Sequence, residues 1–194
     1  MSEHSAVSQG AFEAKYRQST DPWNFSGSRY ERDRYELTLR SLMRSHYRRA
    51  FEPACSIGVL TAALAARCDE LQAIDIAPSA VASARERCAH LPQVTVSCAD
   101  LATQCPPGPF DLIVFSELGY YFSATQLAQV VQRLSARLEA GGELIAVHWL
   151  GDSEDHLLHG DEVHATLKDM LARSCTWIKG ARHPGFRLDT WRRE

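Results

Sequence analysis

Residues 51–85 read FEPACSIGVLTAALAARCDELQAIDIAPSAVASAR, and this stretch decides the fold. A short strand over 49–52 ends in a turn at Pro53. A helix follows, with four apolar residues facing inward: Val59, Leu60, Ala63 and Leu64. The next strand, 71–76, leads to Pro78, which suits the first turn of a helix because its missing N–H is not needed there. We therefore predict a β-α-β-α unit with parallel strands.

The same alternation continues on the C-terminal side of this unit. Further strands are predicted over 94–97, 110–116 (FDLIVFS) and 143–149 (ELIAVHW). The apolar run 110–116 is typical of a central parallel strand that is buried on both faces. A helix capped by Ser123 carries an apolar stripe and is expected to stop at Gly141 and Gly142.

The segments at the two ends of the chain complete the prediction. Upstream, a helix is expected over 33–47, with the basic run RSHYRR (44–49) capping its end. Downstream, a helix opens near Asp161, and four of its residues are expected to face inward: Val163, Leu167, Met170 and Leu171. Two late strands, 175–179 and 185–191, pair as a hairpin.

These elements predict the fold class and the domain organisation. We expect an α/β, Rossmann-like, doubly wound and mostly parallel seven-stranded sheet with an antiparallel C-terminal hairpin edge. Residues 1–34 are expected to form an N-terminal arm or lid, with 1–10 loose, and 35–194 a single domain.

Composition excludes several classes of protein. The chain has 194 residues and a net charge of −3 with mixed signs, which argues against a nucleic-acid partner. No apolar run reaches the ~18 residues that a membrane span requires, and from the polar residues 1–10 we expect no secretory signal. Six cysteines without a C-x-x-C pair predict reduced thiols and a cytoplasmic location.

Ligands of such sheets bind at the carboxyl ends of the strands, so the residues just after each strand are the candidates for a site. After the second strand, Asp75 can accept hydrogen bonds from the cis hydroxyls of a ribose. After the third, Asp100 can accept from the exocyclic amine of adenine. Each acid taken singly could equally be a helix cap, and only the spacing of all the strand ends favours a site.

The chain resembles the class I S-adenosylmethionine methyltransferases over nearly its whole length. FEPACSIGVLT resembles their first motif, an acid followed by G-x-G-x-G, although Ala54 and Ser56 replace the first two glycines and Gly58 alone remains. LQAIDIAPSAVASAR, CADL and PPGPFDLIVFSELGYYF resemble the next three motifs. The depleted glycines argue against the rival interpretation, a nicotinamide-dependent oxidoreductase, because a pyrophosphate prefers the full glycine pattern.

The resemblance implies S-adenosyl-L-methionine as cofactor and assigns residues to it. Glu52 and the bend Ala54–Gly58, with Cys55 and Ser56, would line its methionine half. Asp75 would hold the ribose, Ile76 would pack on the adenine, and Asp100 and Leu101 would hold the adenine edge. Ser116 and Glu117 would follow the fourth strand beside the sulfonium. An aromatic lid of Tyr16, Trp23 and Tyr30 is expected, with a ring stacked near the sulfonium, and Arg32 is a candidate partner of the cofactor carboxylate.

Two segments resemble a narrower group, the nodulation N-methyltransferase NodS and its relatives: DPWNFSGSRYERDRYELTL (21–39) and HWLGDSEDHLLHGDEVHATL (148–167). This resemblance implies methylation of the free amine of a partly deacetylated chitooligosaccharide or another amino sugar. Methylation of oxygen or nitrogen in another small metabolite, and an inactive module that only binds the cofactor, stay open as alternatives.

The polar segment after the fifth strand gathers four histidines and two acids: His148, Asp155, His156, His159, Asp161 and His164. It can be interpreted as a metal site, a solvated loop or an acceptor-binding segment. Without the spacing of known zinc sites, no metal is assigned. We hypothesise that Glu117, His148, Asp161 and His164 face a small-molecule or oligosaccharide acceptor and take part in catalysis.

Overall fold

The structure, a computed structural model, describes residues 8–194. Its helices are α1 (Gln9–Gln18), α2 (Arg29–Ser41), α3 (Val59–Ala65), α4 (Pro78–Cys88), the short 3₁₀ helix η1 (Gly119–Tyr121), α5 (Ala124–Arg137) and α6 (Gly160–Leu171). Its strands are β1 (Tyr47–Pro53), β2 (Cys68–Asp75), β3 (Val94–Cys98), β4 (Phe110–Ser116), β5 (Leu138–Trp149), β6 (Cys175–His183) and β7 (Phe186–Arg193).

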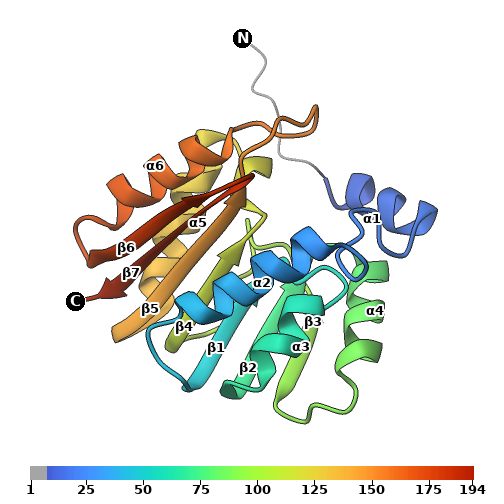
Figure 1. Ribbon diagram of the computed structural model, residues 1–194, viewed down its shortest axis with the longest axis horizontal. Helices are drawn as coiled ribbons and strands as arrows, with labels where there is room; N and C mark the ends of the chain where they lie inside the picture. The colour runs from blue at the N-terminus through green and yellow to red at the C-terminus, as the bar shows by residue number, and fades with distance from the viewer. Residues whose placement is uncertain (1–7) are drawn as a thin grey trace.

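The strands form one seven-stranded sheet in the order β3-β2-β1-β4-β5-β7-β6. Strands β1 to β5 pair with one another in parallel, whereas β7 runs antiparallel to both β5 and β6. Helices α2, α3 and α4 cover one face and α5 and α6 the other (Figure 1). The predicted fold class is therefore confirmed.

Two apolar clusters hold the helices on the two faces. On one face, Phe51, Ile113 and Phe115 pack with the stripe of α5 that begins at Leu127. On the other, Leu112, Val114 and Leu71 pack with Leu60 and Leu64 of α3. Strand β4 supplies side chains to both clusters and is buried along its whole length, as its apolar run predicts.

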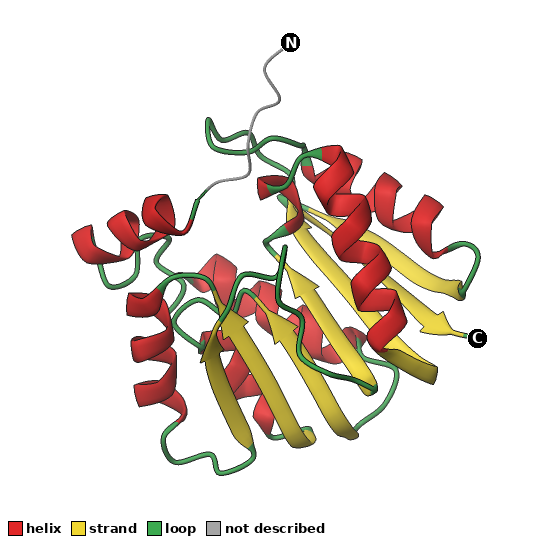
Figure 2. Ribbon diagram, turned by 180° about the vertical axis from the view of Figure 1, so that it is seen from behind, coloured by secondary structure: helices red, strands yellow, loops and turns green. Residues whose placement is uncertain are grey.

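The sheet reverses its strand order between β1 and β4, and this reversal positions the site. Crossovers on either side of it leave a crevice above the carboxyl ends of these two strands. Figure 2 shows the loops that follow the strands gathered at this end of the sheet. No helix within residues 8–194 has the length and apolar character that membrane crossing requires.

Several predicted boundaries are wrong. Residues 1–7 lie outside the described part of the chain, but 9 and 10 are helical because Ser8 caps α1. Helix α2 begins and ends earlier than predicted, so the basic run 44–49 does not cap it; residues 47–49 already belong to β1. The predicted boundary between 34 and 35 falls inside α2.

Two further predictions fail in the C-terminal half. Gly141 and Gly142 do not stop α5; they lie within β5, where a register irregularity accommodates the positive φ of Gly141 before pairing resumes at Glu143. Met170 is exposed rather than inward, because the buried stripe of α6 runs through Val163, His164, Leu167 and Leu171.

Candidate active site

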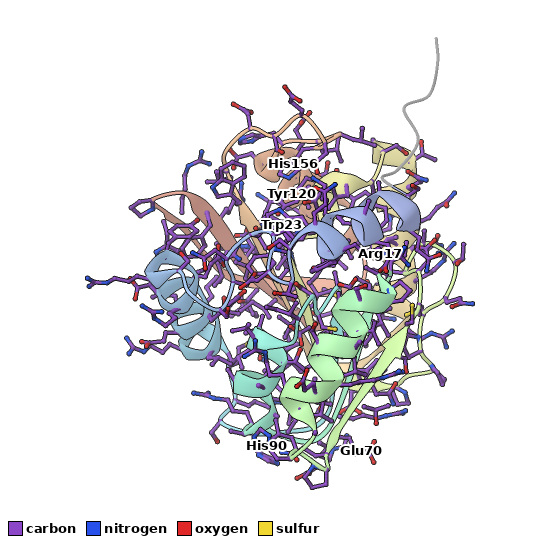
Figure 3. All side chains as sticks on the ribbon, turned by 90° about the vertical axis from the view of Figure 1, so that its right-hand side faces the viewer. Arg17, Trp23, Glu70, His90, Tyr120 and His156 are labelled. Carbon is purple, nitrogen blue, oxygen red and sulfur yellow. The ribbon has the colours of Figure 1, made fainter. Side chains whose placement is uncertain are left out.

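A cleft of about 1020 Å³ opens at the carboxyl ends of the parallel strands. Residues that follow four of these strands line it: Ala54, Asp75, Asp100 and Glu117. Phe12 and Tyr16 of α1 lie across its opening. In Figure 3, Trp23, Tyr120 and His156 gather at this end of the molecule, and Glu70 and His90 lie at the opposite end.

The bend after β1 forms the floor of the cleft in a strained conformation. Ala54 (φ 59°) and Ser56 (φ 51°) both adopt the left-handed region, which favours glycine and costs other residues about 1 kcal/mol or more each. These are the two positions where the resembled motif has glycine, so the backbone path of the motif is kept despite the replacements. Gly58 (φ 77°) does not line the cleft; a Cβ there would lie 3.0 Å from Ala84, so the glycine allows α3 to pack on α4.

Asp75 fixes the bend and keeps further acceptor capacity. Its two oxygens accept the backbone N–H groups of Ser56 and Ala77, each at 2.9 Å. A carboxylate offers about four lone-pair positions, so about two remain for a ligand. Burial raises the pKa of Asp75, and the backbone donors oppose that rise.

Asp100 stands at the end of the neighbouring strand. Its Oδ1 accepts the backbone N–H of Ala102 at 2.8 Å, and Oδ2 has no hydrogen-bond partner among residues 8–194. Ile76 and Leu101 add apolar surface to the same part of the cleft. Two carboxylates with free acceptor positions thus share one cleft with this apolar surface.

A small cavity of about 30 Å³ adjoins the cleft, and the two share Ala54, Ser56 and Glu117. Cys55 and Ser116 also line it, as does Glu52. Glu52 is buried, its Oε2 has no hydrogen-bond partner, and burial raises its pKa to about 8 against the opposing effect of the Thr61 hydroxyl. An acid in this position suits a cationic group that would enter the cavity.

Glu117 is held rigidly at the junction of the two spaces. It takes a positive φ of 54° and forms an ion pair with Nη1 of Arg34 at 2.6 Å. It also accepts the Tyr120 hydroxyl at 2.8 Å and the Trp149 backbone N–H at 2.7 Å. Arg34 is buried and pairs with Glu31 as well. Burial lowers the pKa of this guanidinium, but the two carboxylates outweigh burial and raise it.

Aromatic side chains close the cleft from the N-terminal side. The Tyr16 hydroxyl donates to Oγ of Ser56 at 2.6 Å, and its ring meets Trp23 edge to face at 5.5 Å. Trp23 stacks on Phe25 and lies under Lys15, and Tyr30 lines the same wall. The three aromatic residues expected as a lid are therefore brought to one opening.

Most of the predicted cofactor residues meet at the two spaces. The cleft is lined by Tyr16, Trp23, Ala54, Ser56, Asp75, Ile76, Asp100, Leu101 and Glu117, and the small cavity also by Glu52, Cys55 and Ser116. Arg32 is a correction: it is exposed, and its guanidinium donates to the Gly27 carbonyl. Two positions along a helix face nearly opposite directions, which is why Arg34 reaches the site and Arg32 does not.

The acceptor hypothesis fails for three of its four residues, because His148, His164 and Asp161 do not line the cleft. His148 Nε2 accepts the Gly119 N–H at 3.0 Å, so its proton sits on Nδ1, 3.3 Å from His164 Nε2. His164 Nδ1 in turn donates to Asp189 at 2.6 Å. Both rings are buried and neutral, and burial lowers both pKa values. Asp161 pairs with Arg182 and Arg187 instead.

The structure adds residues that sequence reasoning missed. Glu31, Arg34 and Trp149 lie at the two spaces, and His156, named only within the histidine segment, lines the cleft. A polar helix face such as 31, 34 and 38 gives no signal that distinguishes burial from solvent exposure. Within the described chain, no group of three His, Cys, Asp or Glu side chains is placed to hold a metal ion.

Comparison with known sequences gives a consistent set of relatives. The family model described as Nodulation protein S (NodS) matches residues 11–159. Nodulation protein S of Rhizobium tropici is 30% identical over 160 residues, which are 78% of this chain and 66% of that protein. Nodulation protein S of Sinorhizobium fredii is 31% identical over 64% of this chain and 59% of its own length. The matches thus span about three fifths to two thirds of these relatives.

Solved structures share the fold. A Pseudomonas syringae protein, provisionally assigned as a methyltransferase, is 41% identical, with a TM-score of 0.75 over 84% of this chain and 99% of its own. The N-methyltransferase NodS of Bradyrhizobium japonicum, in complex with S-adenosyl-L-homocysteine, is 24% identical. It superposes with a TM-score of 0.85 over 96% of this chain and 99% of its own.

Proposed function

This chain belongs to the Nodulation protein S (NodS) family, and from that premise we propose that it is an S-adenosylmethionine-dependent methyltransferase that methylates an amino group of an amino sugar or chitooligosaccharide-like acceptor. The cofactor supplies an activated methyl group on a sulfonium. The protein needs to hold the acceptor nitrogen in line with that methyl group and to keep water away.

The observation that carries the proposal is the pair of acceptor positions left free on Asp75 and Asp100. They stand on neighbouring strands at one cleft, where the hydroxyls of a ribose and the exocyclic amine of an adenine need acceptors. Ile76 and Leu101 offer the apolar surface that an adenine ring packs on.

The smaller cavity, at about 30 Å³, has room for a group the size of an ammonium, so it suits the ammonium end of the cofactor's amino-acid half. Glu52, buried with an unpartnered oxygen, would accept from an ammonium group. The residues of the strained bend, Ala54 and Ser56, have small side chains, so a ligand can approach the main chain there. Glu117 and Arg34 would fix the wall between the two halves.

Titration with S-adenosylhomocysteine tests the cofactor assignment. In Asp75→Asn we expect a roughly 10- to 100-fold loss of affinity, because a charged acceptor of two hydroxyls is removed. Asp69→Asn is the matched control: Asp69 lies at the other end of the same strand, is exposed, and should leave affinity unchanged. Equal affinity in both variants, or tight NAD(H) binding without S-adenosylhomocysteine binding, would refute the assignment.

Methyl-labelled cofactor and a panel of amino sugars test the acceptor. Label on a glucosamine nitrogen supports the proposal. Label found only on a phenol or a carboxylate would refute the amino sugar as acceptor and indicate another small metabolite. Cofactor binding without any methyl transfer would indicate a module that only binds the cofactor.

A further inference from the structure

Transfer to an amine requires a proton acceptor in the cleft. At neutral pH an alkylamine is mostly an ammonium ion, which has no lone pair to attack a methyl carbon. A group on the acceptor side of the cleft therefore has to receive a proton before or during transfer.

Two carboxylates of the cleft, Glu117 and Glu31, are poorly suited to this task. Glu117 already accepts from Tyr120 and Trp149 and is paired with Arg34. Its acceptor positions are therefore largely taken by groups of the protein. Glu31 is paired with the same arginine.

His156 differs from these acids because its side chain forms no hydrogen bond or ion pair with any other of residues 8–194. It lines the cleft and is half-buried. Burial lowers its pKa, with His159 and Lys15 acting in the same direction against Asp155 and Glu117. A neutral ring with free nitrogens at neutral pH is the form that a general base requires.

The ring is also held in place. It stacks on Tyr120 with centroids 3.8 Å apart and planes 18° apart, and it meets Tyr121 edge to face at 5.1 Å. The backbone N–H groups of Leu157 and Leu158 both donate to the Tyr120 carbonyl, at 2.8 and 3.2 Å. The Tyr120 hydroxyl in turn donates to Glu117, so Tyr120 contacts both the His156 ring and Glu117. Figure 3 shows Tyr120 and His156 together at the open end of the sheet.

We propose that His156 is the general base of the reaction and takes one proton from the acceptor's ammonium group; this rests on the proposed function. The freed lone pair forms the N–C bond as the C–S bond breaks, and the electron pair of that bond stays on sulfur. The positive charge of the sulfonium passes to the methylated nitrogen. The proton stays on the imidazole ring, beside Asp155 and Glu117, and leaves to solvent from its exposed side.

The test compares kcat/KM against pH for the wild type and for His156→Gln, with an amino sugar as acceptor. We expect a loss on the order of 10²-fold at pH 7 in the variant, with S-adenosylhomocysteine affinity unchanged. In the variant, kcat/KM should rise with pH up to the acceptor's own pKa, because only acceptor already neutral in solution can react. In the wild type it should level off at lower pH, once His156 is neutral.

Two further variants separate the base from the scaffold. His156→Phe keeps the stack on Tyr120 without a nitrogen and should be as impaired as His156→Gln. His90→Gln is the control: His90 is exposed at the opposite end of the molecule (Figure 3), so this variant should leave kcat/KM unchanged. Wild-type rates and an unchanged pH profile in His156→Gln would overturn the proposal. Absence of S-adenosylhomocysteine binding in the wild type would overturn the proposed function itself, and the role of His156 with it.

Discussion

Ala54 and Ser56 hold positive φ angles that their side chains disfavour, and both face the site. Strain of this kind persists where the surrounding structure enforces it and is common at functional positions. Here the bend is enforced by the hydrogen bond from the Ser56 N–H to Asp75 and by the packing of Gly58 on α4.

Relief of this strain is measurable. We expect Ala54→Gly to raise the free energy of unfolding by about 1 kcal/mol. Glycine has no Cβ and so avoids the steric penalty at φ near 60°, and this gain exceeds the loss from its greater chain entropy in the unfolded state. Urea unfolding followed by circular dichroism measures the change. Ala63→Gly is the control: Ala63 was predicted to face inward, but it is exposed within α3, and glycine there should lower stability by a similar amount. A loss of stability in Ala54→Gly would contradict the strain.

Glu52 links stability to pH. Its pKa is about 8 in the folded chain against an ordinary 4.5, so between these values the folded chain keeps a proton that the unfolded chain has released. Each rise in pH within this window therefore favours unfolding, with a cost of roughly 3 kcal/mol by pH 7. Glu52→Gln removes this cost.

The measurement is urea unfolding of ligand-free protein at pH 5.5 and 7.5. Glu52→Gln should gain stability over the wild type at the higher pH. It should also bind S-adenosylhomocysteine more weakly, because glutamine cannot ionise on binding to pair with the ligand's ammonium group. Glu70→Gln, exposed at the far end of the molecule, should follow the wild type in both respects (Figure 3). Because His148 and His164 titrate in the same range with the opposite effect on stability, the test is the difference between the variant and the wild type. A gain from Glu52→Gln that is equal at pH 5.5 and pH 7.5 would refute the raised pKa.

Sequence reasoning at single positions succeeded where strand ends gave the location. Asp75, Asp100 and Glu117 follow strands that the apolar runs identify, so their meeting at one cleft could be predicted. Arg34 could not be distinguished from Arg32, because the choice depends on which side of α2 faces the sheet. That orientation depends on packing with residues far away in the chain, such as Glu117.

Helix α6 is coupled to the sheet through the two buried histidines. The chain of hydrogen bonds from Gly119 through His148 and His164 to Asp189 joins η1, β5, α6 and β7. Its donor order requires both rings to be neutral, so a proton added to either ring breaks a bond in a buried place.

This network predicts a loss of stability in mild acid. Both histidines have pKa values below the ordinary 6.5. As pH falls below 6.5, they therefore bind protons in the unfolded chain but not in the folded chain, and unfolding is favoured. Thermal melting between pH 8 and pH 5 measures the slope. His164→Gln should be less stable at pH 8 by about 2 kcal/mol, since it leaves buried groups poorly paired, and should show a shallower slope. An unchanged slope would contradict the neutral pair.

The helix and strand limits show why element prediction was partly wrong. The apolar period located α2 to α6 and the seven strands but neither α1 nor η1. The ends of the elements depend on local backbone choices that the period does not encode. Residues 44–49 look like the basic end of a helix, yet Tyr47 is drawn into β1, where its hydroxyl donates to buried Glu143. A partner nearly one hundred residues away decides that boundary.

The arrangement of the whole sheet followed from the alternation of strands and helices, since right-handed crossovers leave few possible orders for β1 to β5. The insertion of β7 between β5 and β6 is also compatible with a predicted hairpin. The placement of α1 over the cleft was expected only as a lid of unknown contacts, because a short polar helix carries no signal for the surface that it covers.

Helix α1 is tied to three separate parts of the molecule: Glu13 accepts from Ser79 of α4, Tyr16 donates to Ser56, and Lys15 pairs with Asp155 at 2.9 Å. These anchors lie on different sides of the same opening. We therefore expect a molecule seated beneath them to leave faster when the helix detaches, so its residence time depends on the helix as well as on its own fit. Because the Lys15 pair is partly exposed, high ionic strength weakens that anchor and shortens the stay.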